Sequence, residues 1–260
     1  MPDPRRWWRA IGVGLFLAII GLGGTLLALT LFPLIGLLSR DPAARRRRIQ
    51  GLLHRLFRLY CRAIDRLGIA DVEFAGIERL GDLSGTLIVA NHPSLLDVVM
   101  IMAAVPRVQC VVKGGLWSNP FFRLTVEGAG YLRNDLPPEQ LIESCLGVLR
   151  DGGCLILFPE GTRTPPGTLP RLQRGFAHLA TLAPCDLQVI TLRADPPLLA
   201  KGQTWWRVPE RRTRFRLEVG ERIPIARFLA EPRRPVAARR LTAHLEALFA
   251  ARLAVAEGER

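Results

Sequence analysis

The chain has 260 residues, of which 49% are hydrophobic, so it can form one sizeable α/β domain with an appendage. Its formal net charge is +13, and arginine carries nearly all of it, because Lys113 and Lys201 are the only lysines. Such a charge suits nucleic acid, an anionic membrane or a phosphorylated substrate. The five cysteines and four histidines are scattered, which argues against a metal site or a disulfide framework and favours free thiols.

The strongest membrane signal is the stretch from Ile11 to Leu38, which contains no charged residue. A helix of about 20 apolar residues crosses a bilayer, so this stretch is long enough to do so, and it is too long for a signal-peptide core. Gly21, Gly23 and Gly24 leave a second geometry open, a re-entrant hairpin of two short helices. We therefore expect residues 1–40 to form a membrane anchor, either a helix or a helical hairpin.

Basic clusters flank this stretch and predict its orientation. Arg5, Arg6 and Arg9 accompany Trp7 and Trp8 on one side, and the heavier cluster at 45–48 lies on the other. Because the more basic flank stays in the cytoplasm, we expect the remainder of the chain on the cytoplasmic side of the cell inner membrane. A hairpin would place both flanks there.

Residues 41–70 are predicted to form a basic amphipathic helix. Between Ile49 and Leu67 apolar residues recur at helical spacing, with arginines between them. Such a helix either lies on an anionic leaflet or packs its apolar stripe on the domain, which is the commoner arrangement.

Residues 71–260 alternate between strand and helix patterns. Short apolar runs predict strands at 72–74, 86–90, 108–112, 154–158, 187–192 and 215–219, and helices are expected at 98–105, 120–126, 137–150, 174–182 and 235–253. This alternation predicts a layered α/β domain with a mixed, largely parallel sheet flanked by helices.

The first candidate site is the heptapeptide Asn91-His92-Pro93-Ser94-Leu95-Leu96-Asp97, at the end of a buried strand. A neutral imidazole accepts a proton from a hydroxyl near pH 7, and a carboxylate can hold its other nitrogen. No serine or cysteine nucleophile stands in a recognisable setting, which points to direct attack by a substrate hydroxyl. Ser94 followed by Asp97 is equally a helix N-cap pattern.

Two further candidates follow later in the chain. Phe158-Pro159-Glu160-Gly161-Thr162-Arg163 again ends an apolar strand with a turn, and Arg174 opens the next helix. Ligands bind at the carboxyl edge of open α/β sheets, where arginine grips phosphate and glycine lets backbone amides approach an anion. Gly130-Tyr131-Leu132-Arg133 is a short strand that ends in arginine. Alone, each of these segments is an ordinary turn with a solvated arginine.

In this order the three motifs resemble the glycerolipid (lysophospholipid) acyltransferase family, typified by 1-acylglycerol-3-phosphate acyltransferases. The resemblance runs from about Leu87 to Leu192. It implies that His92 is the general base, that Asp97 orients it, and that Lys113 stabilises the oxyanion. It also implies an acceptor-binding set near these groups: Asn91, Ser94, Arg133, Glu160, Gly161, Thr162, Arg163 and Arg174.

The resemblance implies acyl transfer from the thioester of acyl carrier protein or coenzyme A, as a co-substrate, with no bound cofactor and no metal. The main prediction is therefore a membrane-associated O-acyltransferase that acylates the free hydroxyl of a lysophospholipid, foremost 1-acylglycerol-3-phosphate, in phospholipid synthesis. The family's fourth motif carries a proline that the strand Leu187 to Leu192 lacks, which leaves the acceptor's identity open.

Three other functions compete with this prediction. The first is the same chemistry on another lyso-lipid, and a remoter one is a catalytically inactive, membrane-anchored binding protein. Nucleic-acid binding accounts for the charge but not for the apolar stretch or the His-Asp pair, so we expect no nucleic-acid partner.

Overall fold

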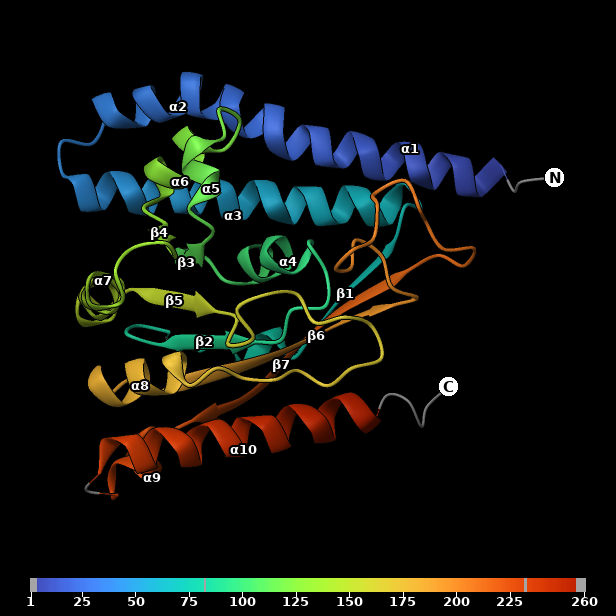
Figure 1. The fold of residues 1–260 in the computed structure, drawn as a ribbon. Coiled ribbons are helices and arrows are strands. Elements are labelled where there is room, and N and C mark those ends of the chain that lie inside the picture. Colours follow the sequence, from blue (N-terminus) through green and yellow to red (C-terminus); the bar gives the residue numbers. More distant parts are fainter. Residues whose placement is uncertain (1–3, 82, 232, 256–260) are drawn as a thin grey trace.

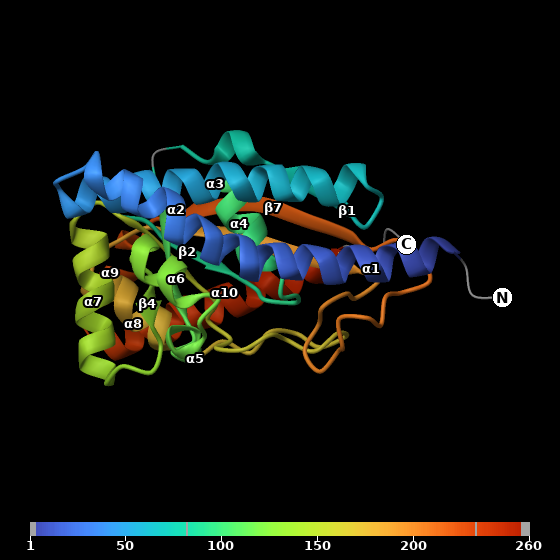
Figure 2. The same ribbon diagram turned by 90° about the horizontal axis from the view of Figure 1, so that it is seen from above.

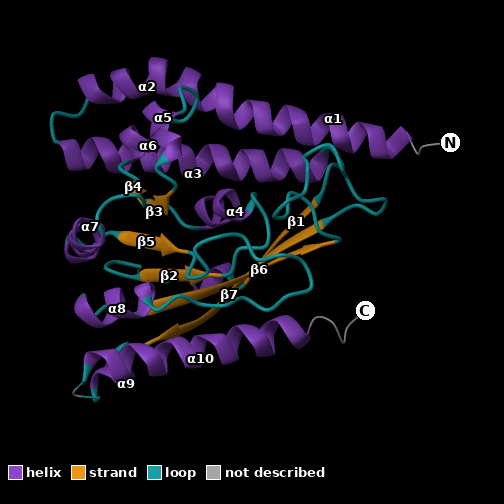
Figure 3. Cartoon of the chain, in the orientation of Figure 1, coloured by secondary structure: helices purple, strands orange, loops and turns teal. Residues whose placement is uncertain are grey.

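A seven-stranded sheet forms the centre of the molecule, with strand order β1-β7-β6-β2-β5-β3-β4 (Figure 1, Figure 3). This computed structural model describes residues 4–81, 83–231 and 233–255. Its strands are β1 (Asp71–Ala75), β2 (Leu87–Ala90), β3 (Val108–Val112), β4 (Leu132–Arg133), β5 (Cys154–Leu157), β6 (Leu187–Asp195) and β7 (Arg214–Ile223). All neighbours pair in parallel except β6 and β7, so the predicted mixed, largely parallel sheet is confirmed.

The two faces of the sheet are buried in two separate cores, as the alternation of side chains along β2 shows. Ile88 and Ala90 lie in a core shared with α3 (Pro42–Arg66) and α4 (Asp97–Ala104). Leu87 and Val89 lie in the opposite core, against helices α7 (Pro138–Arg150), α8 (Gly175–Leu182) and α10 (Arg234–Val255). Because both faces are covered, the central strands are apolar throughout rather than alternating.

The N-terminal apolar stretch forms one long helix that lies along the domain. It consists of α1 (Pro4–Ala18), a π-helical segment η1 (Ile19–Gly23) and α2 (Gly24–Leu37). The helix continues through Gly21, Gly23 and Gly24, so the alternative of two short helices broken at these glycines is wrong. The extra residue of a π turn is absorbed within the helix instead. Residues 5–37 are long and apolar enough to cross a membrane.

The chain then reverses direction, and α3 returns beneath α2 and α1 in the view of Figure 1 and alongside them when seen from above (Figure 2). Asp41 begins α3 as its N-cap, because its carboxylate accepts hydrogen bonds from the backbone N–H groups of Ala43 and Ala44 (3.0 and 2.9 Å). Pro42 follows at the first helical position, which has no need of an N–H donor.

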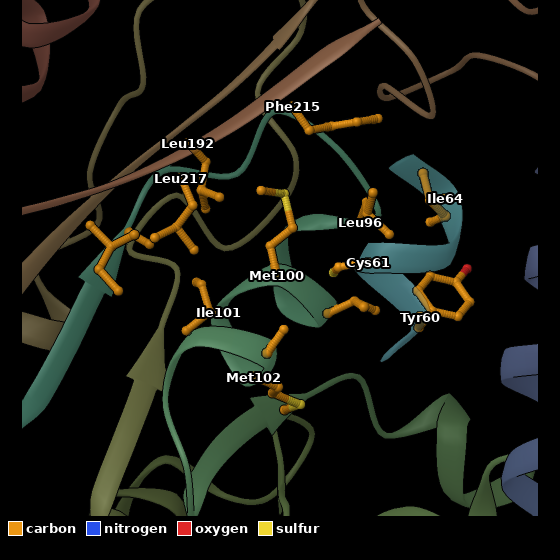
Figure 4. Packing of buried hydrophobic residues seen from close by; sticks show 14 of the residues in the cluster. Tyr60, Cys61, Ile64, Leu96, Met100, Ile101, Met102, Leu192, Phe215 and Leu217 are labelled. Atoms are coloured by element: carbon orange, nitrogen blue, oxygen red, sulfur yellow. The ribbon is translucent and has the colours of Figure 1, made fainter. Parts of the chain in front are cut away.

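Of the two arrangements expected for α3, the structure shows the one in which the apolar stripe packs on the domain. Cys61 and Ile64 of α3 lie in the same core as Met100 of α4 (Figure 4), whereas Tyr60 is turned toward α1, where its hydroxyl donates to the carbonyl of Phe16 (3.0 Å). Side chains of β6 and β7 close the same core. The arginines that alternate with the stripe face outward: Arg55, Arg58, Arg62 and Arg66.

The sequence missed some short elements and misplaced others. Helix α5 (Gly115–Ser118) was not predicted, and the short helix expected at 120–126 is α6 (Arg123–Ala129). A 3-10 turn, η2 (Ile77–Arg79), and a short helix, α9 (Ala226–Leu229), also escaped prediction. These elements are too short for a hydrophobic period to reveal them.

Candidate active site

The first motif forms the loop between β2 and α4 and brings His92 and Asp97 together. Nδ1 of His92 lies 2.8 Å from Oδ2 of Asp97, and the backbone N–H of Ser94 donates to the same oxygen at 2.7 Å. Asp97 is the first residue of α4, where the helix dipole favours a negative charge. When Asp97 accepts a hydrogen bond from Nδ1–H, the free electron pair of the neutral imidazole lies on Nε2. This is the arrangement that a general base requires.

The two members of the pair differ in their access to solvent. The side chain of Asp97 is 1% exposed, whereas that of His92 is 16% exposed, so a substrate can reach the imidazole but not the carboxylate. Burial raises the pKa of Asp97, and its hydrogen bonds to His92 and Ser94, together with the positive charge of Arg163, oppose that rise. Asp97 is therefore placed to orient and support His92 rather than to contact a substrate.

The second motif forms the loop after β5; two hydrogen bonds join it to the first motif, and a third lies within the second loop. The backbone N–H of His92 donates to Oε1 of Glu160 (3.0 Å), and the hydroxyl of Thr164 donates to Oε2. The backbone N–H of Thr164 in turn donates to the carbonyl oxygen of His92 (2.9 Å). Burial raises the pKa of Glu160, against the effect of these hydrogen bonds.

Phe158, at the end of β5, completes the setting of the imidazole. Its ring stacks on that of His92 with centroids 4.2 Å apart and planes 24° from parallel. The imidazole is thus held by the hydrogen bond to Asp97 at one edge and by an aromatic ring on one face. Phe158 belongs to the second motif, but its sequence context predicted no role for it.

Several predicted acceptor-binding residues instead hold the backbone. The side chain of Asn91 donates to the carbonyl of Leu192 (2.8 Å) and accepts from its N–H (2.7 Å). Ser94 is fully buried, and its hydroxyl donates to the carbonyl of Leu198 (2.8 Å), so the predicted substrate contact of Ser94 is wrong for this structure. Asn91 and Ser94 thus form hydrogen bonds with buried backbone groups, because such groups are almost always hydrogen-bonded in folded proteins.

Arg163 also holds a loop. Its Nη1 donates to the carbonyls of Leu199 (2.7 Å) and Ala200 (3.2 Å). The carbonyl of Leu199 accepts a further hydrogen bond from the backbone of Leu95, in the first motif. Nη1 of Arg163 is therefore engaged by the protein itself. The predicted binding of phosphate would have to use the other nitrogens of the guanidinium group.

Gly161 and Thr162 follow Glu160 directly in the second loop, and Arg174 is the N-cap of α8; their predicted contact with the acceptor stays a prediction. Gly161 has φ +69°, a left-handed conformation that favours glycine, and an added Cβ would lie 2.9 Å from Nε2 of Gln173. Thr162 and Arg174 are exposed, and the N–H of Gln173, beside Arg174, donates to the carbonyl of Pro159 (2.8 Å).

Lys113 and Arg133 lie on more distant strands than the prediction requires. The strand order places β5 between β2 and β3, and β4 lies beyond β3 at the sheet edge. With neighbouring strands about 4.8 Å apart, these residues end strands about 10 and 14 Å from β2. Arg133 is also exposed and pairs with Asp135 (2.9 Å). The structure therefore does not bring Arg133 to His92, and the oxyanion role of Lys113 stays a prediction.

A cleft of about 1080 Å³ opens beside the two loops. Asn91, Pro93 and Glu160 line one end of it, next to His92. The loop of residues 164–170, the end of β6, the start of β7 and the end of α10 form its other walls. The volume suits a ligand larger than a single polar head group.

Comparison with known proteins first defines the class. A family model described as Acyltransferase matches residues 71–194, which span the sheet from β1 to β6 and both motif loops. The resemblance to the acyltransferase family, predicted from the His92 and Glu160 motifs, is therefore confirmed, and these residues form an acyltransferase-like domain.

Within this class, the similar proteins are 1-acyl-sn-glycerol-3-phosphate acyltransferases. One from Cocos nucifera is 36% identical over 99 residues, or 35% of this chain and 32% of the relative. One from Helicobacter pylori is 33% identical over 98 residues, or 35% of this chain and 41% of the relative. The chain thus matches well under half the length of these curated relatives.

The fold itself has a solved counterpart. The 1-acyl-sn-glycerophosphate (LPA) acyltransferase PlsC from Thermotoga maritima superimposes with a TM-score of 0.68, covering 95% of this chain and 99% of that one. The two sequences are 18% identical, so this likeness shows a shared fold that includes the N-terminal helices.

Proposed function

We propose that the protein transfers a fatty acyl group from an acyl thioester to the free hydroxyl of a lysophospholipid, foremost 1-acylglycerol-3-phosphate. The observation that carries the proposal is the His92–Asp97 pair, fixed at 2.8 Å, with the neighbours of His92 in the chain, Asn91 and Pro93, in the lining of a cleft. The names of the similar proteins favour the glycerophosphate acceptor.

The reaction would need one proton acceptor and one electrophile. Nε2 of His92 would remove the proton of the acceptor hydroxyl as its oxygen attacks the thioester carbonyl carbon. The C–S bond would then break as the ester C–O bond is completed, and the proton on His92 would pass to the leaving thiolate. Asp97 would stabilise the imidazolium in between. Electrons and protons balance without any further reactant.

Glu160 acts in this scheme through its hold on the backbone of His92. It accepts from the N–H of His92 and from the hydroxyl of Thr164, so both carboxylate oxygens are engaged. Its role would be to fix the distance between the two loops. The polar head of the acceptor would then meet the exposed parts of the second loop, at Thr162 and Arg174.

The acceptor is a lipid, and the N-terminal helix offers a surface to the membrane. One side of this helix is buried on the domain through Val13, Phe16 and Phe32, whereas the opposite side exposes an apolar row. The row consists of Ile11, Leu15, Ile19, Leu22, Leu26 and Leu29. A helix packed lengthwise on its own domain suits attachment within one leaflet rather than a free spanning segment.

The test is acyl transfer from labelled acyl carrier protein and acyl coenzyme A to a panel of lysolipids, with wild type and His92→Ala side by side. We expect transfer to lysophosphatidate that falls at least about 10²-fold in the variant. Transfer only to a different lysolipid would replace the acceptor. Equal rates in both proteins, or no transfer by the wild type, would refute the proposal and favour a binding protein.

A second measurement addresses attachment. The protein should sediment with anionic vesicles and stay bound in high salt, which weakens purely electrostatic attachment. Replacing Leu22 and Leu26 with serine should reduce the bound fraction, whereas Arg239→Ala should leave it unchanged. Release of the wild-type protein by salt alone would contradict apolar insertion.

A further inference from the structure

One wall of the cleft is built by arginines that none of the three motifs contains. Arg211, Arg212, Arg214 and Arg216 come from the start of β7 and the loop before it. Because β7 runs antiparallel to β6, its first residue pairs with the last residue of β6, Asp195. The beginning of β7 therefore lies at the same edge of the sheet as the loops that hold His92 and Glu160.

Ion pairs occupy two of these four arginines. Arg212 pairs with Asp71 (3.1 Å) and Asp65 (3.4 Å), and Arg216 pairs with Glu73 (3.3 Å). Arg211 and Arg214 are exposed, and neither forms an ion pair with a carboxylate in the parts of the chain that the structure describes. The lining of the cleft thus includes two exposed guanidinium groups, together with the carboxylate of Asp195, and guanidinium groups bind phosphate in a two-pronged manner.

The facing wall is apolar. It is made by Ala250, Leu253 and Ala254 in the last turns of α10, and by prolines of the 164–170 loop. A cleft that is lined by arginines, by apolar residues and by Asn91 and Pro93 on either side of His92 fits an elongated ligand that carries a phosphate some distance from its reacting carbon.

We propose that this cleft holds the phosphopantetheine arm of the acyl donor, with its phosphate on Arg211 and Arg214 and its thioester beside His92. The inference rests on the proposed function and adds the place of the donor to it. Phosphopantetheine is common to acyl carrier protein and coenzyme A, so the same contacts serve either donor.

The position of the cleft favours the donor over the acceptor. The apolar row on α1 and α2 lies on one side of the sheet, and α10, which lines the cleft, lies on the other (Figure 1). A lysolipid would arrive from the membrane on the first side. A water-soluble carrier would arrive from the second, and the two substrates would meet at His92.

The test compares Arg211→Ala, Arg214→Ala and the double variant with wild type, using acyl-CoA and acyl carrier protein as donors. Arg239→Ala, an exposed arginine of α10 outside the cleft, is the matched control. We expect the KM for the donor to rise about 10- to 100-fold in the double variant. The KM for the lysolipid should stay within about twofold, and the donor KM should become less sensitive to salt.

Comparing the KM for acyl-CoA with the KM for acyl carrier protein identifies which phosphate the two arginines bind. A rise for both donors indicates the phosphopantetheine phosphate itself, whereas a rise for acyl-CoA alone indicates its nucleotide phosphates, and a rise for acyl carrier protein alone indicates its protein surface. Only the first result supports the inference, because the other two place Arg211 and Arg214 on groups that the two donors do not share. An unchanged donor KM, or a rise in the lysolipid KM instead, would overturn the inference while leaving the proposed function intact.

A binding measurement separates this inference from the proposed function. If the wild type transfers no acyl group, titration with coenzyme A and with holo acyl carrier protein still tests the cleft. Affinity lost in the double variant and retained in Arg239→Ala would support the carrier site. Equal affinity in wild type and the double variant would refute it.

Discussion

Asp97→Asn isolates the contribution of the carboxylate without changing its size. In the structure Oδ2 of Asp97 accepts from both Nδ1 of His92 (2.8 Å) and the N–H of Ser94 (2.7 Å). An asparagine oxygen in the place of Oδ2 can keep both contacts but carries no negative charge to stabilise the imidazolium, and an amide NH2 group in that place is a donor. Where it faces Nδ1, the imidazole must move its proton to Nε2, and the base is lost.

We expect kcat of Asp97→Asn to fall about 10²–10⁴-fold, the contribution typical of a general base with a correctly held tautomer. The KM for the lysolipid should change little, because Asp97 is 1% exposed and out of reach of a substrate. The double variant His92→Ala/Asp97→Asn should be no slower than His92→Ala, since the two residues act as one unit.

The assay is steady-state acyl transfer, with the folded state verified by circular dichroism and urea unfolding. Stability serves as an internal control, because removing a buried charge is not expected to destabilise the fold strongly. Burial raises the pKa of Asp97, so ionisation of this group opposes folding at neutral pH. A folded variant with kcat within threefold of wild type would show that Asp97 does not support the base.

Three further variants test the roles of buried groups. Asn91→Ala should lower the free energy of unfolding by about 2–4 kcal/mol, because two backbone groups of Leu192 lose their partners; a raised lysolipid KM with unchanged stability would restore a binding role. Glu160, whose pKa is raised by burial, contributes stability that is present below its ordinary pKa of 4.5 and lost as pH rises through its folded pKa. In urea titrations the difference in stability between wild type and Glu160→Gln should therefore shift in favour of wild type from pH 8 to pH 4.5, and a constant difference would contradict this. Ile101→Ala, fully buried between α4 and the sheet, should cost about 2–5 kcal/mol, against little for the exposed Leu59→Ala.

The sequence predicted the sheet well because its strands are continuous apolar runs. The pattern at 108–112 and the turn residues around 86–90 correspond closely to β3 and β2. The antiparallel β7 was expected as a strand, but its direction was not, because periodicity carries no information about direction. That direction matters, since it brings Arg214 to the edge where the site lies.

The sequence predicts which residues belong to the site better than it predicts the contacts that each of them makes. His92 and Asp97 are five residues apart, so local structure alone brings them together. The partners of Asn91 and Ser94 are more than one hundred residues away in the chain, and only the fold reveals that both side chains hold backbone groups. For Arg133, strand order was the missing information: a short strand after Gly130 gives no sign that it lies at the sheet edge.

Hydrogen bonds between three loops of the protein give the imidazole of His92 its rigidity. The loop of His92 is tied to the second loop through Glu160 and Thr164, and to the segment after β6 through Leu95 and Leu199. Arg163 joins the second loop to that same segment, so the three loops form a closed set of contacts. Since His92 can hardly shift without breaking several of these bonds, its orientation is set by folding and not at the moment of reaction, which is how preorganised sites lower a barrier.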